Sequence, residues 1–299
     1  MAAEADDTRL PHLLESYRGL VRARVLESRW AELEEKGANL PRRAARGVEA
    51  ALAGAAFALG AEDWVLGEGT ELPVPFLRGA TLSEFVAHAF GRAPNPWNAR
   101  ARRTLASDLR NGAHVTQGVG VAWGAKIERR DVAVLVTFDD AIRTTGEFHN
   151  GVNFAGVFKA PAIFLCLTTL AQEASAERAA DFAAAYGIAS AVCDGCDFFA
   201  VAHAVGDARK RAASGLGPTL LEARIDEARA SKDDALVSLR RHLESRGFFD
   251  VEHEARTESE AASEIALALS EFAPGAAATA TASVAPESRI VVPTRRRTE

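Results

Sequence analysis

Two pairs of oxygen-bearing side chains in the middle of the sequence have the types and the spacing of a metal site. Asp139 and Asp140 come directly after the apolar run VAVLVTF, and Thr168 and Thr169 come directly after the apolar run PAIFLCL. If the two runs are neighbouring strands of a parallel sheet, both pairs lie at the edge where such sheets bind ligands. A carboxylate and a neutral oxygen can hold Mg²⁺ there, with diphosphate oxygens and water completing the octahedron.

The same spacing also fits a simpler arrangement. An aspartate directly after a strand can cap the next helix, and two threonines can belong to a loop. Taken alone, the spacing favours this second interpretation, and the metal site stays open beside it.

Apolar runs alternate with helical patterns from about residue 112 onward, around these side chains. This order predicts an α/β fold with a doubly wound parallel sheet and helices on both of its faces. The expected strands cover 132–138, 161–167, 188–193 and 218–225, and the expected helices cover 117–126, 146–158, 174–185 and 197–214.

Helical patterns are also expected on both sides of this region, as an N-terminal helical extension and as closing C-terminal helices. Residues 65–80, which hold glycines and prolines, are expected to form a loop. We expect one domain over 14–272, between a flexible N-terminus at 1–13 and a disordered tail at 273–299 that is rich in Ala, Thr and Pro. The expected flanking helices cover 10–37, 47–60, 81–91, 234–247 and 257–272.

The bulk composition is that of a globular protein. A net charge of −6 gives no overall attraction to nucleic acid or to an anionic membrane, and no apolar run reaches the ~20 residues of a membrane-spanning helix. The acidic N-terminus lacks the pattern of a secretory signal, and three cysteines are too few for a disulfide framework. These features predict a cytoplasmic protein with neither a nucleic-acid partner nor a membrane partner.

Two further motifs each admit more than one interpretation. His149, one turn into the expected helix 146–158, could be a catalytic base, but its place favours a packing role. Cys193 and Cys196 form a Cys-x-x-Cys that could be redox-active or half of a zinc site. Two loop cysteines without chemistry are the favoured interpretation.

The sequence around the first site resembles a known family. Residues 145–155, TGEFHNGVNFA, and the run VFKAPAIFL are similar to the thiamine diphosphate motif in the alpha subunits of pyruvate and branched-chain 2-oxo-acid dehydrogenases. The similarity continues through GVEAALAGAAFALGAEDWV, GAHVTQGVGVAWGAK, AAYGIASAVCDGCDFFAV, SGLGPTLLEA and LRRHLESRGFFD. These collinear blocks span about residues 14–272, and the resemblance implies the thiamine-diphosphate-binding fold.

The resemblance also assigns residues to the cofactor. The family's metal-binding Asp falls on Asp140, which with Thr168 would hold Mg²⁺. The glycine after that Asp falls on Ala141, and an Asn pair falls on Thr168 and Thr169. A Tyr-Arg pair that grips the cofactor falls on Gly69 and Thr70, so no guanidinium remains there. The segment EARIDEARASKDD lacks the family's His.

The function implied is that of an alpha subunit in an α2β2 dehydrogenase. Such an enzyme oxidatively decarboxylates a 2-oxo acid at thiamine diphosphate and Mg²⁺ between alpha and beta subunits, and passes the acyl group to a lipoyl acyltransferase core. Because most cofactor-facing positions have changed, we expect weak or lost cofactor binding by this chain. The alternative is an inactive alpha-like subunit that scaffolds or regulates a beta-like partner, or that forms a homo-oligomer.

Overall fold

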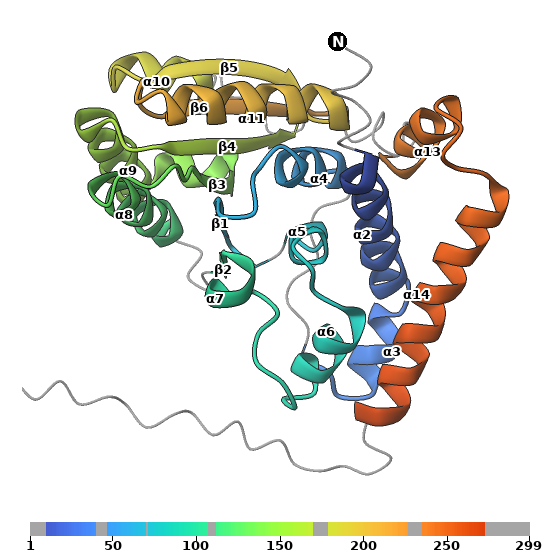
Figure 1. Cartoon of the computed structure of the whole chain (residues 1–299). Coiled ribbons are helices and arrows are strands. Elements are labelled where there is room, and N and C mark those ends of the chain that lie inside the picture. Colours follow the sequence, from blue (N-terminus) through green and yellow to red (C-terminus); the bar gives the residue numbers. More distant parts are fainter. Residues whose placement is uncertain are drawn as a thin grey trace, which may run out of the picture.

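A computed structural model describes most of the chain and shows a sheet flanked by helices (Figure 1). The N-terminal residues 1–9 and the tail 273–299, for which flexibility and disorder were expected, lie outside the described residues. The described ranges are 10–39, 47–69, 71–106, 112–169, 179–226 and 235–272.

Six parallel strands form the sheet, in the order β2-β1-β3-β4-β6-β5. The predicted parallel, doubly wound architecture is therefore confirmed. β3 and β4 are neighbours, and Asp139 stands opposite Leu167 in their register, so the two strand ends do converge. The strands are β1 (Trp64–Gly67), β2 (Thr104–Ala106), β3 (Val134–Asp139), β4 (Ala162–Thr169), β5 (Ala189–Asp194) and β6 (Thr219–Ile225).

The central strands β3 and β4 are continuous apolar runs because both of their faces are buried. Leu135 and Leu165 pack into one core cluster, with helices α4 (Glu49–Phe57) and α11 (Phe198–Ala213). Val136 and Phe164 pack into another cluster on the opposite face. That face is covered by α8 (Ala113–Ile127), α9 (Gly146–Phe158) and α10 (Ala179–Ala185).

Small residues let two of these helices approach their neighbours closely. A Cβ on Gly118 of α8 would lie 2.5 Å from Cγ2 of Val136 on β3, and one on Gly54 of α4 would lie 2.3 Å from the backbone oxygen of Phe198 on α11. Both helices therefore pack tightly, α8 against the sheet and α4 against another helix.

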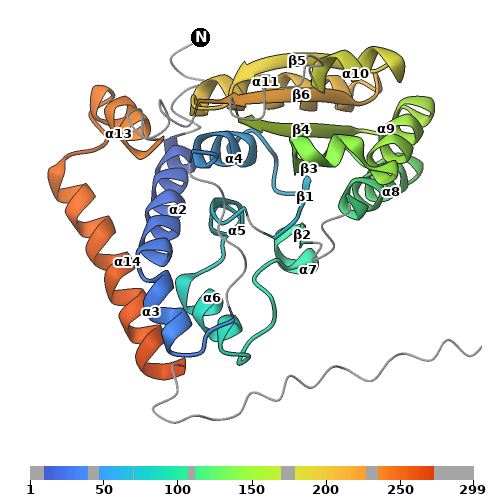
Figure 2. The same cartoon turned by 180° about the vertical axis from the view of Figure 1, so that it is seen from behind.

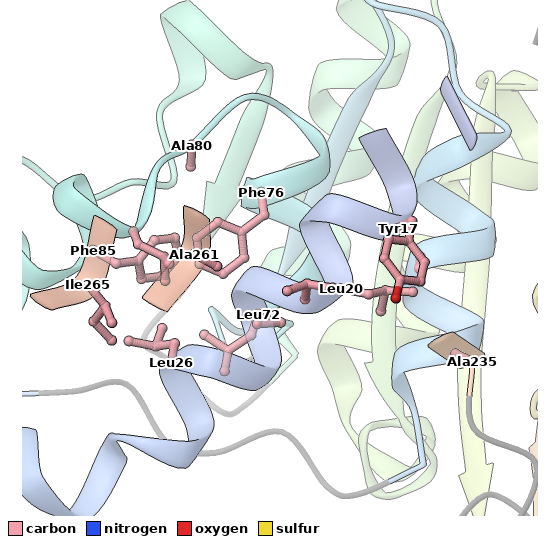
Figure 3. Packing of buried hydrophobic residues seen from close by; sticks show 14 of the residues in the cluster. Tyr17, Leu20, Leu26, Leu72, Phe76, Ala80, Phe85, Ala235, Ala261 and Ile265 are labelled. Atoms are coloured by element: carbon pink, nitrogen blue, oxygen red, sulfur yellow. The ribbon is translucent and has the colours of Figure 1, made fainter. Parts of the chain in front are cut away.

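The remaining helices build a third core beside the sheet. Leu20 and Leu26 of α2 pack with Leu72, Phe85 and Ile265 in one cluster, which Figure 3 shows from close by. The long helix α14 lies alongside α2 in both views (Figures 1 and 2). These helices are α2 (Leu10–Ser28), α3 (Trp30–Glu35), α5 (Pro73–Leu77), α6 (Leu82–Ala89), α13 (Ala235–Ser245) and α14 (Val251–Phe272).

One expectation was wrong: residues 65–80 are not a loop, because they contain most of β1 and all of α5. Pro73 stands in the first turn of α5, where proline costs no hydrogen bond. The short elements β2 and α7 (Ala99–Arg102) were not expected either. In the described part of the chain, no helix has the length and hydropathy to cross a membrane.

One buried carboxylate ties the amino ends of β1 and β3 to α11. Asp63, which directly precedes β1, is fully buried. Its Oδ1 accepts the backbone N–H of Ala133 at 2.8 Å, and its Oδ2 accepts that of Gly60 at 2.8 Å. Arg209 on α11 donates to both oxygens, at 3.2 and 3.5 Å. A charge can be buried only with such partners, so Asp63 stabilises the junction of three chain segments.

Replacing Asp63 with Ala should therefore destabilise the chain strongly. The change leaves two backbone N–H groups and a guanidinium without their buried partner, and we expect a loss of about 3 kcal/mol in the free energy of unfolding. Asp131→Ala is the matched control, because Asp131 pairs with the same Arg209 but is exposed, and it should cost less than about 1 kcal/mol. Urea unfolding measures both, and equal losses would contradict the role of Asp63.

Candidate functional site

The predicted site residues lie at the carboxyl edge of the sheet. Asp140 begins a 3-10 turn, η1 (Asp140–Thr144), directly after β3, and Thr168 and Thr169 are the last residues of β4 and not, as expected, a loop after it. The side chains of Asp140 and Thr168 both lie close to the buried thiol of Cys166. Sγ of Cys166 lies 3.7 Å from Oδ1 of Asp140 and 3.6 Å from Oγ1 of Thr168. Both predicted metal ligands are thus brought together.

Asp139 has the capping role that the simpler interpretation gave to an aspartate at this place. Its side chain is at the exposed end of β3, and Oδ1 accepts the backbone N–H of Ala141 at 3.0 Å. The cap holds the start of η1 and so sets the direction of the chain after Asp140. The backbone N–H of Ala141 is therefore already hydrogen-bonded to the carboxylate of Asp139.

Asp140 is engaged by a side chain that sequence analysis did not single out. Nε of Arg143 lies 2.5 Å from Oδ1 of Asp140, and Nη2 donates to Oδ2 at 2.7 Å. The side chains of Asp140 and Arg143 are 11% and 8% exposed, so this is a buried ion pair with one hydrogen bond and one close ionic contact. The spacing of three residues within one helical turn was an available signal for it.

The surroundings keep Arg143 in place and charged. Its guanidinium lies over the ring of Phe182, 5.1 Å from the centroid. Burial lowers the pKa of Arg143, but the hydrogen bond and the negative charge of Asp140 outweigh burial, so the net shift is upward. The carboxylate at the predicted metal position is therefore neutralised by a cation of the chain.

The tip of β1 carries the positions matched to the family's Tyr-Arg pair. Gly69 has a φ of +83°, and Thr70 lies outside the described residues. The buried Glu71 folds back beneath the tip, where its Oε1 accepts the N–H of Glu68 and the hydroxyl of Thr137, each at 3.0 Å. Burial raises the pKa of Glu71. The side chain of Glu71 therefore holds the backbone of Glu68 against Thr137 of β3.

Further titratable groups surround the tip. Burial and the charges of Asp139 and Glu71 raise the pKa of Glu68 to about 7. His114, at the start of α8, is fully buried, and its Nε2 lies 3.1 Å from the backbone oxygen of Thr137. Burial lowers the pKa of His114 and favours its neutral form. The tips of β1 and β3 thus bring carboxyl groups close together, and the neutral imidazole of His114 adds no positive charge there.

These residues do not fit a magnesium diphosphate group. Mg²⁺ requires oxygen ligands at about 2.0–2.1 Å in a nearly ideal octahedron. Both oxygens of Asp140 instead contact Arg143, and the hydroxyl of Thr168 faces the thiol of Cys166. Among the residues that the structure describes, His, Cys, Asp and Glu side chains form no group of three or more that could hold a metal ion.

The other motifs make contacts of their own. Nδ1 of His149 contacts the hydroxyl of Tyr186, and its ring packs against Phe148 and Phe182, in keeping with a packing role. Cys193 and Cys196 form no disulfide with each other, and the thiol of Cys196 donates to the backbone oxygen of Asp226 at 3.6 Å. Burial, followed by the charges of Asp194 and Glu222, raises the pKa of Cys193 to about 11, so little reactive thiolate forms at neutral pH.

A cavity of about 290 Å³ lies at another place in the fold, beside the segment that leads into β1. The residues of the predicted site do not line it. Its lining comes from the first turns of α2, the end of α4 and the neighbourhood of α5 and α7, and consists of His12, Glu15, Ser16, Ala56, Phe57, Leu59, Ala61, Leu77, Arg78, Ala101 and Arg102.

Comparison with known proteins agrees with the resemblance noted in the sequence. Residues 17–226 match the family described as "Dehydrogenase E1 component". The 2-oxoisovalerate dehydrogenase subunit alpha of Bacillus subtilis is 30% identical over 252 residues, which cover 77% of this chain and 76% of that protein. The pyruvate dehydrogenase E1 component subunit alpha of Staphylococcus epidermidis is 28% identical over 298 residues, 91% of this chain and 80% of that protein.

A solved structure is similar at a lower level. It is that of a proposed thiamin diphosphate-dependent enzyme from Mycobacterium smegmatis, with 14% identity and a TM-score of 0.37. The match covers 59% of this chain and 31% of that chain. At this level the similarity adds nothing to the assignment of the fold, which rests on the sheet itself.

The raised pKa of Glu68 predicts a pH dependence of stability. Between its ordinary pKa of 4.5 and about 7, the folded chain binds more protons at Glu68 than the unfolded chain, so the stability associated with this group falls as the pH rises. The Glu68→Gln variant has no titrating group at this position, so it lacks this fall in stability with rising pH. In urea unfolding, the variant should gain stability relative to the wild type from pH 5 to pH 8, and a constant difference across that range would contradict the shift.

Proposed function

Because this chain belongs to the dehydrogenase E1 component family, we propose that it serves as the alpha-type component of a 2-oxo-acid dehydrogenase and works with a beta-type partner in an α2β2 assembly. The length of the match supports this role, since it runs from α2 through β6 and thus includes all six strands. A cytoplasmic location is part of the same proposal.

We further propose that cofactor binding by this chain is weak or lost. The observation that carries this proposal is the ion pair at Asp140, because both oxygens of that carboxylate contact the Arg143 guanidinium. A carboxylate whose charge is balanced by a guanidinium of its own turn attracts a metal ion less strongly, because the ion must displace the guanidinium or share the carboxylate with it.

The tips of β1 and β3 support the same proposal from the side of the diphosphate. Glu68 and Asp139 place carboxyl groups at this edge, and the raised pKa of Glu68 reflects, after its burial, their mutual repulsion. A diphosphate would add more negative charge to a region that already disfavours it. The arginine that the family uses to grip the cofactor has no counterpart at Gly69 and Thr70.

The enzyme and scaffold forms of the role differ in where the chemistry resides. In the enzyme form, thiamine diphosphate bound between the subunits supplies the decarboxylation, and the acyl group passes to a lipoyl acyltransferase core. In the scaffold form, this chain stabilises or regulates a beta-like partner and provides no cofactor ligands. The Asp140–Arg143 pair favours the scaffold form, in which the chain keeps the fold of the family without providing cofactor ligands.

Calorimetric titration with the beta-type subunit from the same genome tests this function. We expect a stable complex on size-exclusion chromatography. The dissociation constant for thiamine diphosphate in the presence of Mg²⁺ should exceed about 1 mM, which corresponds to a binding free energy weaker than about −4 kcal/mol. Saturable, magnesium-dependent binding that Asp140→Ala abolishes would restore the enzyme form and make Thr168 a working ligand. Failure to form any complex with the beta-type subunit would contradict the alpha-type role itself.

A further inference from the structure

The Asp140–Arg143 pair has a geometry that a surface ion pair does not have. Nη2 of the guanidinium donates to Oδ2 of the carboxylate at 2.7 Å, Nε lies 2.5 Å from Oδ1, and both groups come from one five-residue turn. The pair is also buried, so water screens it little. The guanidinium therefore lies in contact with both carboxylate oxygens, through one hydrogen bond and one close ionic contact.

The side chains around the ion pair favour a positive charge at this place. On one side of the guanidinium lies the ring of Phe182, whose face attracts positive charge. Near the carboxylate lie Cys166 and Thr168, and Cys166 is fully buried. The positive charge therefore lies at the end of the sheet, between β4 and Phe182 of α10, with the Asp140 carboxylate as its counter-charge.

A divalent ion at Asp140 would have to share this place with Arg143. Two cations at the same carboxylate repel each other, and each oxygen of Asp140 already has a donor, Nη2 of Arg143 at Oδ2 and the thiol of Cys166 at Oδ1. Binding of Mg²⁺ would require Arg143 to leave both the carboxylate and the Phe182 ring. The chain thus carries, three residues after Asp140, a group that competes with metal at that carboxylate.

We propose that Arg143 is the resident cation of this site: its guanidinium supplies the positive charge beside Asp140 that a divalent ion would otherwise supply, and thereby excludes that ion. The proposal rests on the proposed loss of cofactor binding and names the residue responsible. According to this proposal, Arg143 determines whether a divalent cation binds at the carboxyl edge of the sheet.

Cation rescue of an arginine deletion tests the proposal on the purified full-length chain. Arg143→Ala should lower the melting temperature by about 5 °C, because it leaves a buried carboxylate without its partner. Millimolar Mg²⁺ or Mn²⁺ should restore most of that loss in Arg143→Ala and leave the wild type unchanged. In Asp140→Asn/Arg143→Ala, which has no carboxylate to neutralise, divalent ions should have no effect.

Arg18→Ala is the matched control. Arg18 pairs with Glu15 at 2.7 Å and at the same three-residue spacing, but both side chains are exposed, so this variant should neither lose stability nor respond to divalent ions. The paramagnetism of Mn²⁺ gives a second readout, because the relaxation of bulk water reports one saturable site in Arg143→Ala and none in the wild type.

Three results would overturn the proposal. One is a single saturable Mn²⁺ site in the wild type that Asp140→Asn removes. Another is rescue of Arg143→Ala by methylguanidinium but not by Mg²⁺ or Mn²⁺, which would make the pair purely structural. The third is an Arg143→Ala chain too unstable to purify, together with an Asp140→Asn/Arg143→Ala chain that is equally unstable, since the double variant carries no unpaired charge. None of these results depends on the beta-type subunit, so the alpha-type role is judged separately by complex formation.

Discussion

The buried carboxylate of Asp63 is the interaction on which the arrangement of the sheet depends. It joins the start of β1, the segment before β3 and the helix α11, which are far apart in the sequence. A parallel sheet needs such ties because its strands are connected by crossovers and not by hairpins. With the amino ends fixed by Asp63, the register of β1 against β3 places Leu66 opposite Val136 and brings the tips of both strands to one edge.

The two edges of the sheet use buried charge in opposite ways. At the amino edge, Asp63 is satisfied by donors from separate segments, and the result is a structural junction. At the carboxyl edge, Asp140 pairs with Arg143 of its own turn, and its contact with another segment is the thiol of Cys166 on β4. The side chains of Glu68 and Glu71 also lie at this edge, and burial raises the pKa of both. This contrast explains why the framework is that of the family while the ligand positions differ.

Much of the framework could be predicted from the sequence. The helix 146–158 has the bounds that its pattern indicated, because Thr145 caps its start with a hydrogen bond to Phe148 and the apolar face repeats at helical spacing. The strand β1 was missed because four residues, followed by Glu68 and Gly69, give too short a pattern to distinguish from a loop. The meeting of Asp140 with Thr168 followed from strand adjacency, which the alternation of elements predicts. Its engagement by Arg143 depends on the side-chain conformation in η1, and composition and spacing do not specify that conformation. The position of Thr70 and the segment with Asp233 and Asp234 lie outside the described residues.

The turn η1 places Asp140 and Arg143 in a single stretch of five residues. The carboxylate and its partner are therefore encoded three residues apart, in one turn that no crossover helix separates. A substitution at position 143 alone changes the charge that faces Asp140, whereas the register of β3 against β4 is set by the backbone groups of those strands.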